Sequence, residues 1–181
     1  MSGYRTRLNW CRRKQDLTSK VSTEFKLWLH DNSSLTAKII DACNGKFRVE
    51  VLSEGRTTPT PDEIQALGLR FRSQAIIRQV LLLCDDEPWV YARSVIPMTT
   101  LIGPLRRLSK LGSKPLGAIL FSNKRIVRSH MEVTRLSPEH PCYNWTGHSG
   151  NEVIPGRRSI FRLYKKPVLV SEFFLPEIIK K

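Results

Sequence analysis

The fold is decided by the central stretch SQAIIRQVLLLCDDEPWVYARSVI, residues 73–96. Residues 73–84 are rich in Ile, Val and Leu and predict a strand, and the polar residues 85–88 predict a turn. Trp89–Ile96 has the composition of a returning strand, so the stretch predicts an antiparallel hairpin. Pro97 ends the hairpin, because proline has no N–H group to donate to a sheet ladder.

The rest of the chain alternates between short helices and further strands. We expect helices at residues 23–30, 35–43, 62–67, 99–111 and 115–121. Further strands are expected at residues 46–51, 126–136, 159–164 and 168–174, with a long loop over residues 137–156. No internal repeat or linker divides the sequence, so we expect a single domain over residues 1–181. The predicted fold class is α+β, with a mainly antiparallel sheet.

The charge of the chain is strongly basic. The 181 residues carry a formal net charge of +14, and residues 88–131 contain no acid at all. Such an excess indicates a nucleic acid, an anionic membrane surface or an anionic small molecule as the binding partner. No zinc-finger spacing, aromatic RNA-binding motif or basic zipper accompanies the charge. Nucleic acid is therefore the least favoured of the three partners.

Cysteine usage and the N-terminus bear on the compartment. Four cysteines are widely spread and form no CxxC pair: Cys11, Cys43, Cys84 and Cys142. Such sparse cysteines are not typical of a disulfide scaffold, and Cys84, which ends an apolar run, is interpreted as a buried thiol. The basic residues of the N-terminus precede no apolar segment of the kind a signal peptide needs, and no run approaches about 18 apolar residues. We expect an ordinary basic arm and a reducing, cytoplasmic location.

Two charged residues interrupt runs that otherwise predict buried strands. Because side chains alternate along a strand, Arg78 shares a face with Ile76, Val80 and Leu82, and Glu172 is the lone charge on its own face. A buried guanidinium cannot lose its proton and needs an anionic partner. At this point two interpretations stand: Arg78 and Glu172 form a structural ion pair, or they line a polar pocket that binds an anionic metabolite.

The residues around this pair occur in an order that resembles the chorismate pyruvate-lyase family. The matching pieces are Arg78–Cys84, Glu87-Pro88-Trp89, Arg93 with Val95 and Pro97, Thr100-Leu101, Gly103-Pro104, Leu111-Gly112, Pro115-Leu116-Gly117, Leu120-Phe121, Arg157-Arg158-Ser159, Lys166-Pro167, and Glu172 with Phe174-Leu175-Pro176. One tripeptide would be a weak signal, but the ordered set covers most of the chain. The resemblance favours the pocket over the structural ion pair.

The resemblance implies a six-stranded antiparallel sheet with two helical flaps over an internal ligand site. Carried over by position, Arg78 should bind the ring carboxylate, and Glu172 should meet the hydroxyl end and take part in proton transfer. The backbone at Leu116 should contact the product carboxylate, and Leu35 in the first flap should cover the ring. We therefore expect Arg78 and Glu172 to face opposite ends of one aromatic acid, with a ligand-sized gap and no direct ion pair between them.

The implied reaction removes pyruvate from chorismate and leaves 4-hydroxybenzoate for ubiquinone biosynthesis. Aromatisation of the ring supplies driving force, so no cofactor is expected. Whether Glu172 shuttles the proton or only positions the substrate stays open. A second arginine should hold the pyruvyl carboxylate, and Arg157, Arg158 and Arg128 are candidates by location.

The main alternative function is a non-catalytic sensor, because the same fold resembles the small-acid-binding domains of some transcription regulators. The expected partners are chorismate and the two products, with a monomer in solution, no nucleic acid and weak contact with an anionic membrane surface. No metal site is expected, since His140, Cys142 and His148 do not follow a common zinc spacing.

Overall fold

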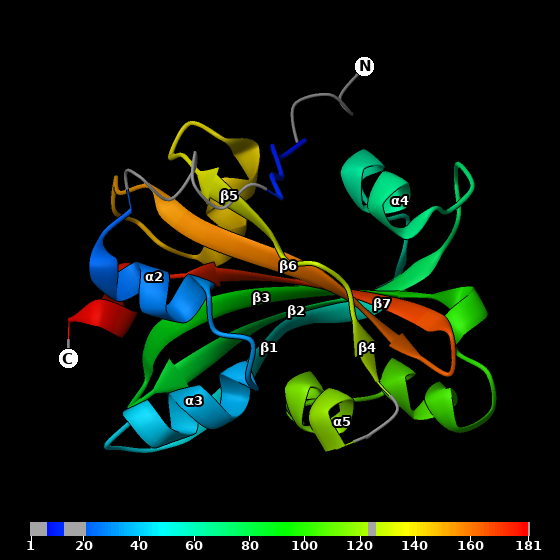
Figure 1. Cartoon of the computed structure of the whole chain (residues 1–181), viewed down its shortest axis with the longest axis horizontal. Helices are drawn as coiled ribbons and strands as arrows, with labels where there is room; N and C mark the ends of the chain where they lie inside the picture. The colour runs from blue at the N-terminus through cyan, green and yellow to red at the C-terminus, as the bar shows by residue number, and fades with distance from the viewer. Residues whose placement is uncertain (1–6, 13–20, 123–125, 181) are drawn as a thin grey trace.

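A single antiparallel sheet forms the centre of the molecule in the computed structural model, which describes residues 7–12, 21–122 and 126–180 (Figure 1). Its strands are β1 (Phe47–Thr57), β2 (Ala75–Cys84), β3 (Glu87–Pro97), β4 (Val127–Arg128), β5 (Glu132–Leu136), β6 (Ile154–Leu163) and β7 (Lys166–Phe174). The order across the sheet is β1-β2-β3-β7-β6-β4, and β5 also pairs with β6. The predicted α+β class and antiparallel sheet are confirmed.

The helices are short. They are α2 (Thr23–Leu29), α3 (Leu35–Ala42), α4 (Pro61–Leu67) and α5 (Leu116–Ser122), with 3₁₀ helices η1 (Met98–Thr100), η2 (Gly103–Ser109), η3 (Pro141–Thr146) and η4 (Pro176–Ile179). Side-chain hydrogen bonds explain where two of the α-helices begin. The Ser34 hydroxyl accepts from the Ala37 N–H at the start of α3, and Thr60 and Glu63 form a capping box on α4. No helix in the described part of the chain is long and apolar enough to cross a membrane.

The hairpin predicted from the opening stretch is present as β2 and β3. Its two turn residues, Asp85 and Asp86, both have positive φ angles, 49° and 67°. Tyr164 and Lys165 repeat this geometry between β6 and β7, with φ angles of 48° and 64°. Paired left-handed residues give a two-residue turn whose twist matches that of the flanking strands. The two tight turns therefore set the register of both hairpins.

Four details differ from the sequence-based expectation. The sheet has seven strands rather than six, because residues 126–136 supply both β4 and β5, which pair one after the other along β6. The stretch 99–111 forms parts of two 3₁₀ helices, η1 and η2, instead of one α-helix, and Gly103, the first residue of η2, takes a left-handed φ of 51°. The expected loop over 137–156 contains η3, and its last three residues already belong to β6, which begins at Ile154 and not at residue 159. Cys84 is buried as predicted, yet it is bonded to Cys43 and is not a free thiol.

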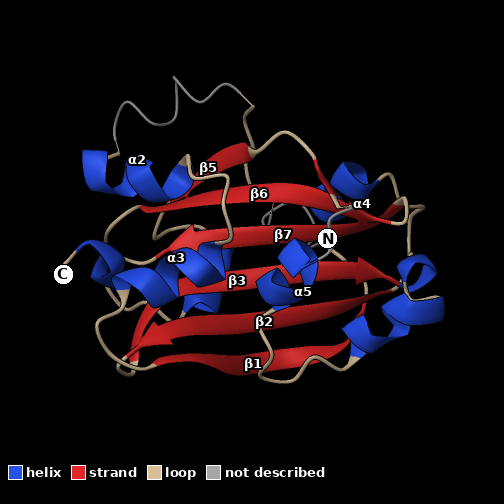
Figure 2. Ribbon diagram, turned by 60° about the horizontal axis from the view of Figure 1, so that its bottom comes forward, coloured by secondary structure: helices blue, strands red, loops and turns tan. Residues whose placement is uncertain are grey.

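The sheet has two covered faces, named here after one arginine on each. The Arg78 face is covered by α2, α3 and α5, which pack on apolar side chains such as Val80 and Val170; Figure 2 shows α3 and α5 in front of it. The Arg93 face is covered by α4, η3 and the arm 7–12, which pack around Ile77, Tyr91 and Phe173. Both faces of the central strands are therefore buried, as the composition of β2 predicts.

Candidate functional site

A cavity on the Arg78 face brings together all four residues predicted for the site. Arg78, Glu172, Leu35 and Leu116 line it, and its volume is about 40 Å³. Its floor is the sheet, with Val80, Leu82, Ala92, Ser94 and Val170, and its roof is formed by the first residues of α3 and α5. The cavity is mostly apolar with a few charged groups, which is the usual character of a small-molecule site.

The register of the strands fixes the spacing of Arg78 and Glu172 along the floor. Arg78 lies beside Ser94 and, through it, Val170, whereas Glu172 lies beside Ala92. The two residues are thus two strands apart and offset by two positions along the strand. With about 4.8 Å between strands and about 3.4 Å per residue, their Cα atoms are about 12 Å apart. This spacing places the two side chains at separate ends of the cavity.

Arg78 is almost fully enclosed and has an acidic partner of its own. Its side chain is 2% exposed, and Nε lies 3.2 Å from Oε2 of Glu54. Nη2 donates to the carbonyl oxygens of Gly112 at 2.7 Å and Lys114 at 3.1 Å. Burial lowers the pKa of Arg78, and the charge of Glu54 opposes that shift. The guanidinium is therefore held between β1 and the segment that leads into α5.

A β-bulge explains why Glu54 reaches Arg78. Val49 and Val51 pair with β2 in regular alternation, but the register shifts between Val51 and Ser53. The extra residue moves Glu54 to the same face as Arg78, where the two are direct cross-strand neighbours. Uninterrupted alternation would place Glu54 on the other face.

Glu172 is held by a different arginine. Its Oε2 accepts from Nε of Arg157 at 2.6 Å, and the two residues are cross-strand neighbours on β7 and β6. Nη1 of Arg157 donates to the carbonyl oxygens of Trp28 at 2.8 Å and Asp31 at 2.5 Å. Arg78 and Glu172 therefore pair with separate partners, and no ion pair joins them to each other. Sequence reasoning named neither Glu54 nor Arg157 as the partner.

The roof of the cavity depends on a close approach of two helices. Leu35 and Leu116, 5% and 6% exposed, are the first residues of α3 and α5. A Cβ atom on Gly117 would lie 2.9 Å from Oγ1 of Thr36, so only glycine lets the two helices meet without displacement. The covalent bond between Cys43 and Cys84 then ties the end of α3 to the end of β2, the strand that carries Arg78.

Comparison with known proteins identifies the family of the chain. A family model described as "Chorismate lyase" matches residues 5–181. The chain belongs to the chorismate lyase family. A protein of Azoarcus sp. named "Probable chorismate pyruvate-lyase" is 43% identical over 159 residues, which is 84% of each chain. A protein of the same name from Methylococcus capsulatus is 38% identical and covers 84% of this chain and 94% of its own length.

Solved structures extend the likeness to the fold. The C-terminal domain of the histidine utilization repressor of Pseudomonas syringae covers 75% of this chain with a TM-score of 0.59 and 10% identity. The effector domain of PhnF from Mycobacterium smegmatis covers 73% with a TM-score of 0.53 and 11% identity. At such low identity these likenesses show the fold that the lyase family shares with regulator domains.

The three candidates for a second arginine lie in different places in this chorismate lyase family member. Arg157 holds Glu172, as described above. Arg158 points to the Arg93 face, where it pairs with Asp62 at 3.1 Å and Glu132 at 2.7 Å. Arg128 lies next to β6, with its guanidinium 5.2 Å from the ring of Phe161, a residue that lines the cavity. Arg128 and Arg158 both line the polar cleft and not the cavity, but Arg128 contacts a residue of the cavity, Phe161.

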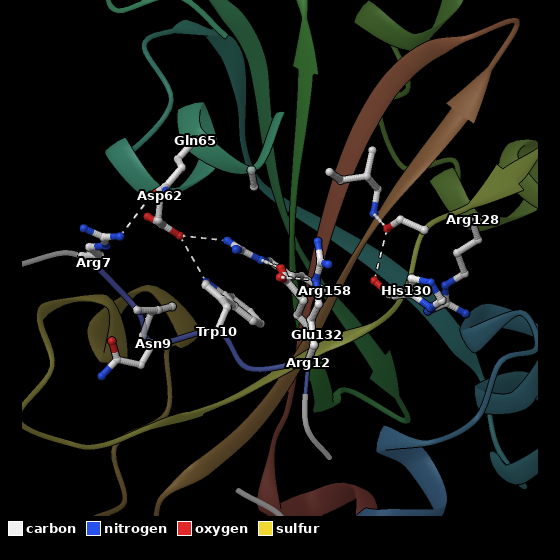
Figure 3. Close-up of a pocket in the computed structure, with 14 residues that line it drawn as sticks. Arg7, Asn9, Trp10, Arg12, Asp62, Gln65, Arg128, His130, Glu132 and Arg158 are labelled. Atoms are coloured by element: carbon white, nitrogen blue, oxygen red, sulfur yellow. Dashed lines mark hydrogen bonds and ion pairs between the residues drawn. The ribbon is translucent and has the colours of Figure 1, made fainter. Parts of the chain in front are cut away.

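A larger and more polar cleft lies on the Arg93 face (Figure 3). Trp10, Asp62, Glu132 and Arg158 contact one another in its walls. Arg7, Arg12 and Arg128 also line it, so the cleft keeps an excess of positive charge. In the described part of the chain, no cluster of three or more His, Cys, Asp or Glu side chains could hold a metal ion. His140 accepts from the Cys142 N–H, and His148 contacts Glu152.

Proposed function

We propose that this chain is a chorismate pyruvate-lyase that converts chorismate into 4-hydroxybenzoate and pyruvate and so supplies ubiquinone biosynthesis. The observation that carries the proposal is the cavity with Arg78 at one end and Glu172 at the other, within a chain that belongs to the chorismate lyase family. A guanidinium suits a ring carboxylate, and a carboxylate suits a hydroxyl group.

The reaction needs no change of oxidation state in the protein. The ring loses the hydrogen on C4 as a proton, the bond between C3 and the enolpyruvyl oxygen breaks, and the ring becomes aromatic. The departing enolpyruvate takes up one proton at its methylene carbon and becomes pyruvate, so the atoms balance. Glu172 is suited to moving this proton, because Arg157 engages Oε2 and no partner for Oε1 is found in the described residues.

The other predicted residues have supporting roles in this proposal. Leu35 covers the ring, and the backbone at Leu116 contacts the ring carboxylate near Arg78. Both residues lie where α3 and α5 meet over the cavity. Excluding water there strengthens every electrostatic contact with the substrate and prevents side reactions of the enolpyruvyl group.

Incubation of the purified protein with chorismate tests the proposal. We expect equimolar release of pyruvate and 4-hydroxybenzoate, followed with a coupled lactate dehydrogenase assay and by chromatography. We also expect Arg78→Met to lower kcat/KM by about 10²–10³-fold, since it removes a charge-assisted carboxylate contact in a desolvated site. A wild-type protein that binds 4-hydroxybenzoate and releases no pyruvate would instead support a ligand sensor, the function that the regulator-like fold favours.

The location and assembly that we propose are a monomer in the cytoplasm that makes weak contact with an anionic membrane surface. The surface is the end of the sheet where β2 begins and β3 ends (right in Figures 1 and 2). Phe71, Ile102 and Tyr164 are exposed there by 84%, 51% and 56%. The same segments of the chain carry the basic residues Arg70, Arg72, Arg106, Arg107, Lys165 and Lys166. Exposed apolar side chains together with basic residues are typical of peripheral membrane binding.

Flotation with phosphatidylserine-containing and neutral vesicles tests this contact. We expect partial co-flotation only with the anionic vesicles, lost in 0.5 M salt and reduced in a Phe71→Ser variant. Equal recovery with both kinds of vesicle would contradict it.

A further inference from the structure

Arg128, on β4, lines the polar cleft of Figure 3, and its guanidinium reaches the edge of the cavity at Phe161, 5.2 Å from that ring. Its Nε donates to Oγ of Ser159 at 3.0 Å, and Nη1 donates to the carbonyl oxygen of Asn32 at 3.2 Å. Ser159 stands in the same cross-strand row as Arg78, since the row runs from Arg78 through Ser94 and Val170 to Ser159. Three strand spacings separate the ends of that row, about 14 Å between Cα atoms.

The guanidinium of Arg128 differs from those of the enclosed arginines in its partners. Arg78, Arg93, Arg157 and Arg158 each contact a carboxylate. In the described part of the chain, Arg128 has no carboxylate within ion-pair distance and contacts only a hydroxyl, a carbonyl and an aromatic ring. Burial lowers the pKa of Arg128, and the neighbouring charge of Arg157 lowers it further. A partly desolvated cation beside a second cation is best stabilised by an added anion.

We propose that Arg128 binds the carboxylate of the enolpyruvyl group of chorismate. This inference rests on the proposed function. Chorismate is a diacid, and the enolpyruvyl ether on C3 is next to the C4 hydroxyl, which meets Glu172. The second carboxylate therefore belongs near Glu172 and away from Arg78. Arg128 fits that place, because it contacts Ser159, which lies beside Val170, two positions along β7 from Glu172.

Arg128 is the strongest of the three candidate arginines because each of the other two is paired with a carboxylate. Arg157 uses Nε for Glu172 and Nη1 for two backbone carbonyls. Arg158 lies across the sheet and is held by Asp62 and Glu132. Arg128 also donates to the backbone of Asn32, just before α3, so an anion bound there would contact the edge of the first flap. Chorismate would then contact Arg128 and 4-hydroxybenzoate would not, since 4-hydroxybenzoate lacks the second carboxylate.

Steady-state kinetics of Arg128→Met test the inference. We expect the KM for chorismate to rise about 10- to 100-fold, the loss typical of one charge-assisted contact, with kcat changed less than about threefold. The inhibition constant of 4-hydroxybenzoate should stay within about twofold of the wild-type value, because the product makes no contact with Arg128. Arg128→Lys should recover part of the KM, since it keeps the charge without the planar fork.

A matched control is Arg162→Met, which removes an exposed arginine from the same strand edge and should leave both constants unchanged. If Arg128→Met raised KM and the inhibition constant by the same factor, the effect would be a general loosening of the site and the inference would be wrong. An unchanged KM would overturn it as well. A wild-type protein without lyase activity would overturn the proposed function and this inference together, so the two failures are distinguishable.

Discussion

Two neighbouring rows of residues run across the same strands, and the side chains of the two rows point to opposite faces of the sheet. On the Arg93 face, Arg93, Ser171 and Arg158 stand side by side on β3, β7 and β6. One position along, Ala92, Glu172 and Arg157 form the next row on the Arg78 face. Both rows contain buried arginines. The two faces differ in how completely their carboxylates neutralise the charges of these arginines.

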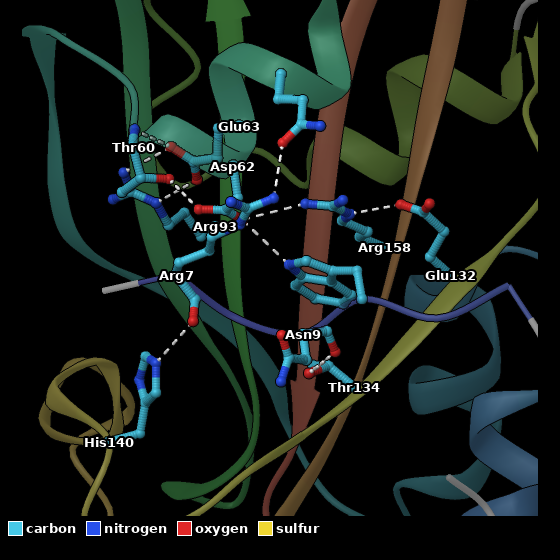
Figure 4. A network of polar contacts seen from close by, with 12 residues as sticks. Arg7, Asn9, Thr60, Asp62, Glu63, Arg93, Glu132, Thr134, His140 and Arg158 are labelled. Carbon is cyan, nitrogen blue, oxygen red and sulfur yellow. Dashed lines mark hydrogen bonds and ion pairs between the residues drawn. The ribbon is translucent and has the colours of Figure 1, made fainter. Parts of the chain in front are cut away.

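On the Arg93 face, carboxylates of the protein itself pair with the buried arginines. Arg93 makes two contacts with Glu63, at 2.7 and 3.1 Å, and Arg158 bridges Asp62 and Glu132 (Figure 4). Tryptophan rings cover both guanidinium groups, Trp145 at 4.8 Å and Trp10 at 4.5 Å. On the Arg78 face, Arg128 forms no ion pair with a carboxylate of the described residues, and Arg78 shares its donors between Glu54 and backbone carbonyls. A complete network indicates a structural role, and an incomplete one indicates a place for an anionic ligand.

The largest effect is expected from breaking the complete network. Arg158→Met should lower the free energy of unfolding by about 3–5 kcal/mol, because it leaves the carboxylates of Asp62 and Glu132 without their buried cation. Urea denaturation followed by circular dichroism measures this change. The KM for chorismate in the folded fraction should match the wild type. A large rise in KM with normal stability would mean that the Arg93 face takes part in substrate binding.

The next effect concerns the bond that holds the roof over the Arg78 face. Cys43→Ser should lower the free energy of unfolding by about 2–4 kcal/mol, because the disulfide closes a loop with a sequence separation of 41 residues. It should also raise the KM, since α3 carries Leu35. Thermal unfolding with and without dithiothreitol checks the first point. Cys11→Ser is the control and should change neither quantity; equal effects of the two variants would show that the bond does not form in solution.

The sequence predicts the sheet well because its signals are local. Alternation identifies the faces of β2 and β7, and the isolated charges at Arg78 and Glu172 point to the cavity. The partners of these charged residues cannot be predicted from local sequence, because they depend on how distant strands pair. A bulge after Val51 brings Glu54 to Arg78, and the pairing of β6 with β7 brings Arg157 to Glu172.

The disulfide escapes prediction for a related reason. Cys43 and Cys84 are far apart in sequence, and their Cα atoms come within 5.8 Å only because α3 returns over the end of β2. Four scattered cysteines give no spacing pattern that fixes a connectivity. The interpretation of Cys84 as a thiol was therefore wrong, although its burial was predicted correctly.

The two acids of the Arg78 face give the most sensitive comparison. Glu172→Gln keeps the shape of the side chain and removes its capacity to carry a proton, so kcat should fall about 10²-fold, within the usual range for general acid–base catalysis. Glu54→Gln removes only the charge beside Arg78 and should act mainly on the KM and on the affinity for 4-hydroxybenzoate. Stopped-flow single-turnover assays with chorismate separate the chemical step from product release. If Glu172→Gln changed the KM and left the single-turnover rate intact, Glu172 would position the substrate, and the proton would pass directly from the ring to the enolpyruvyl group.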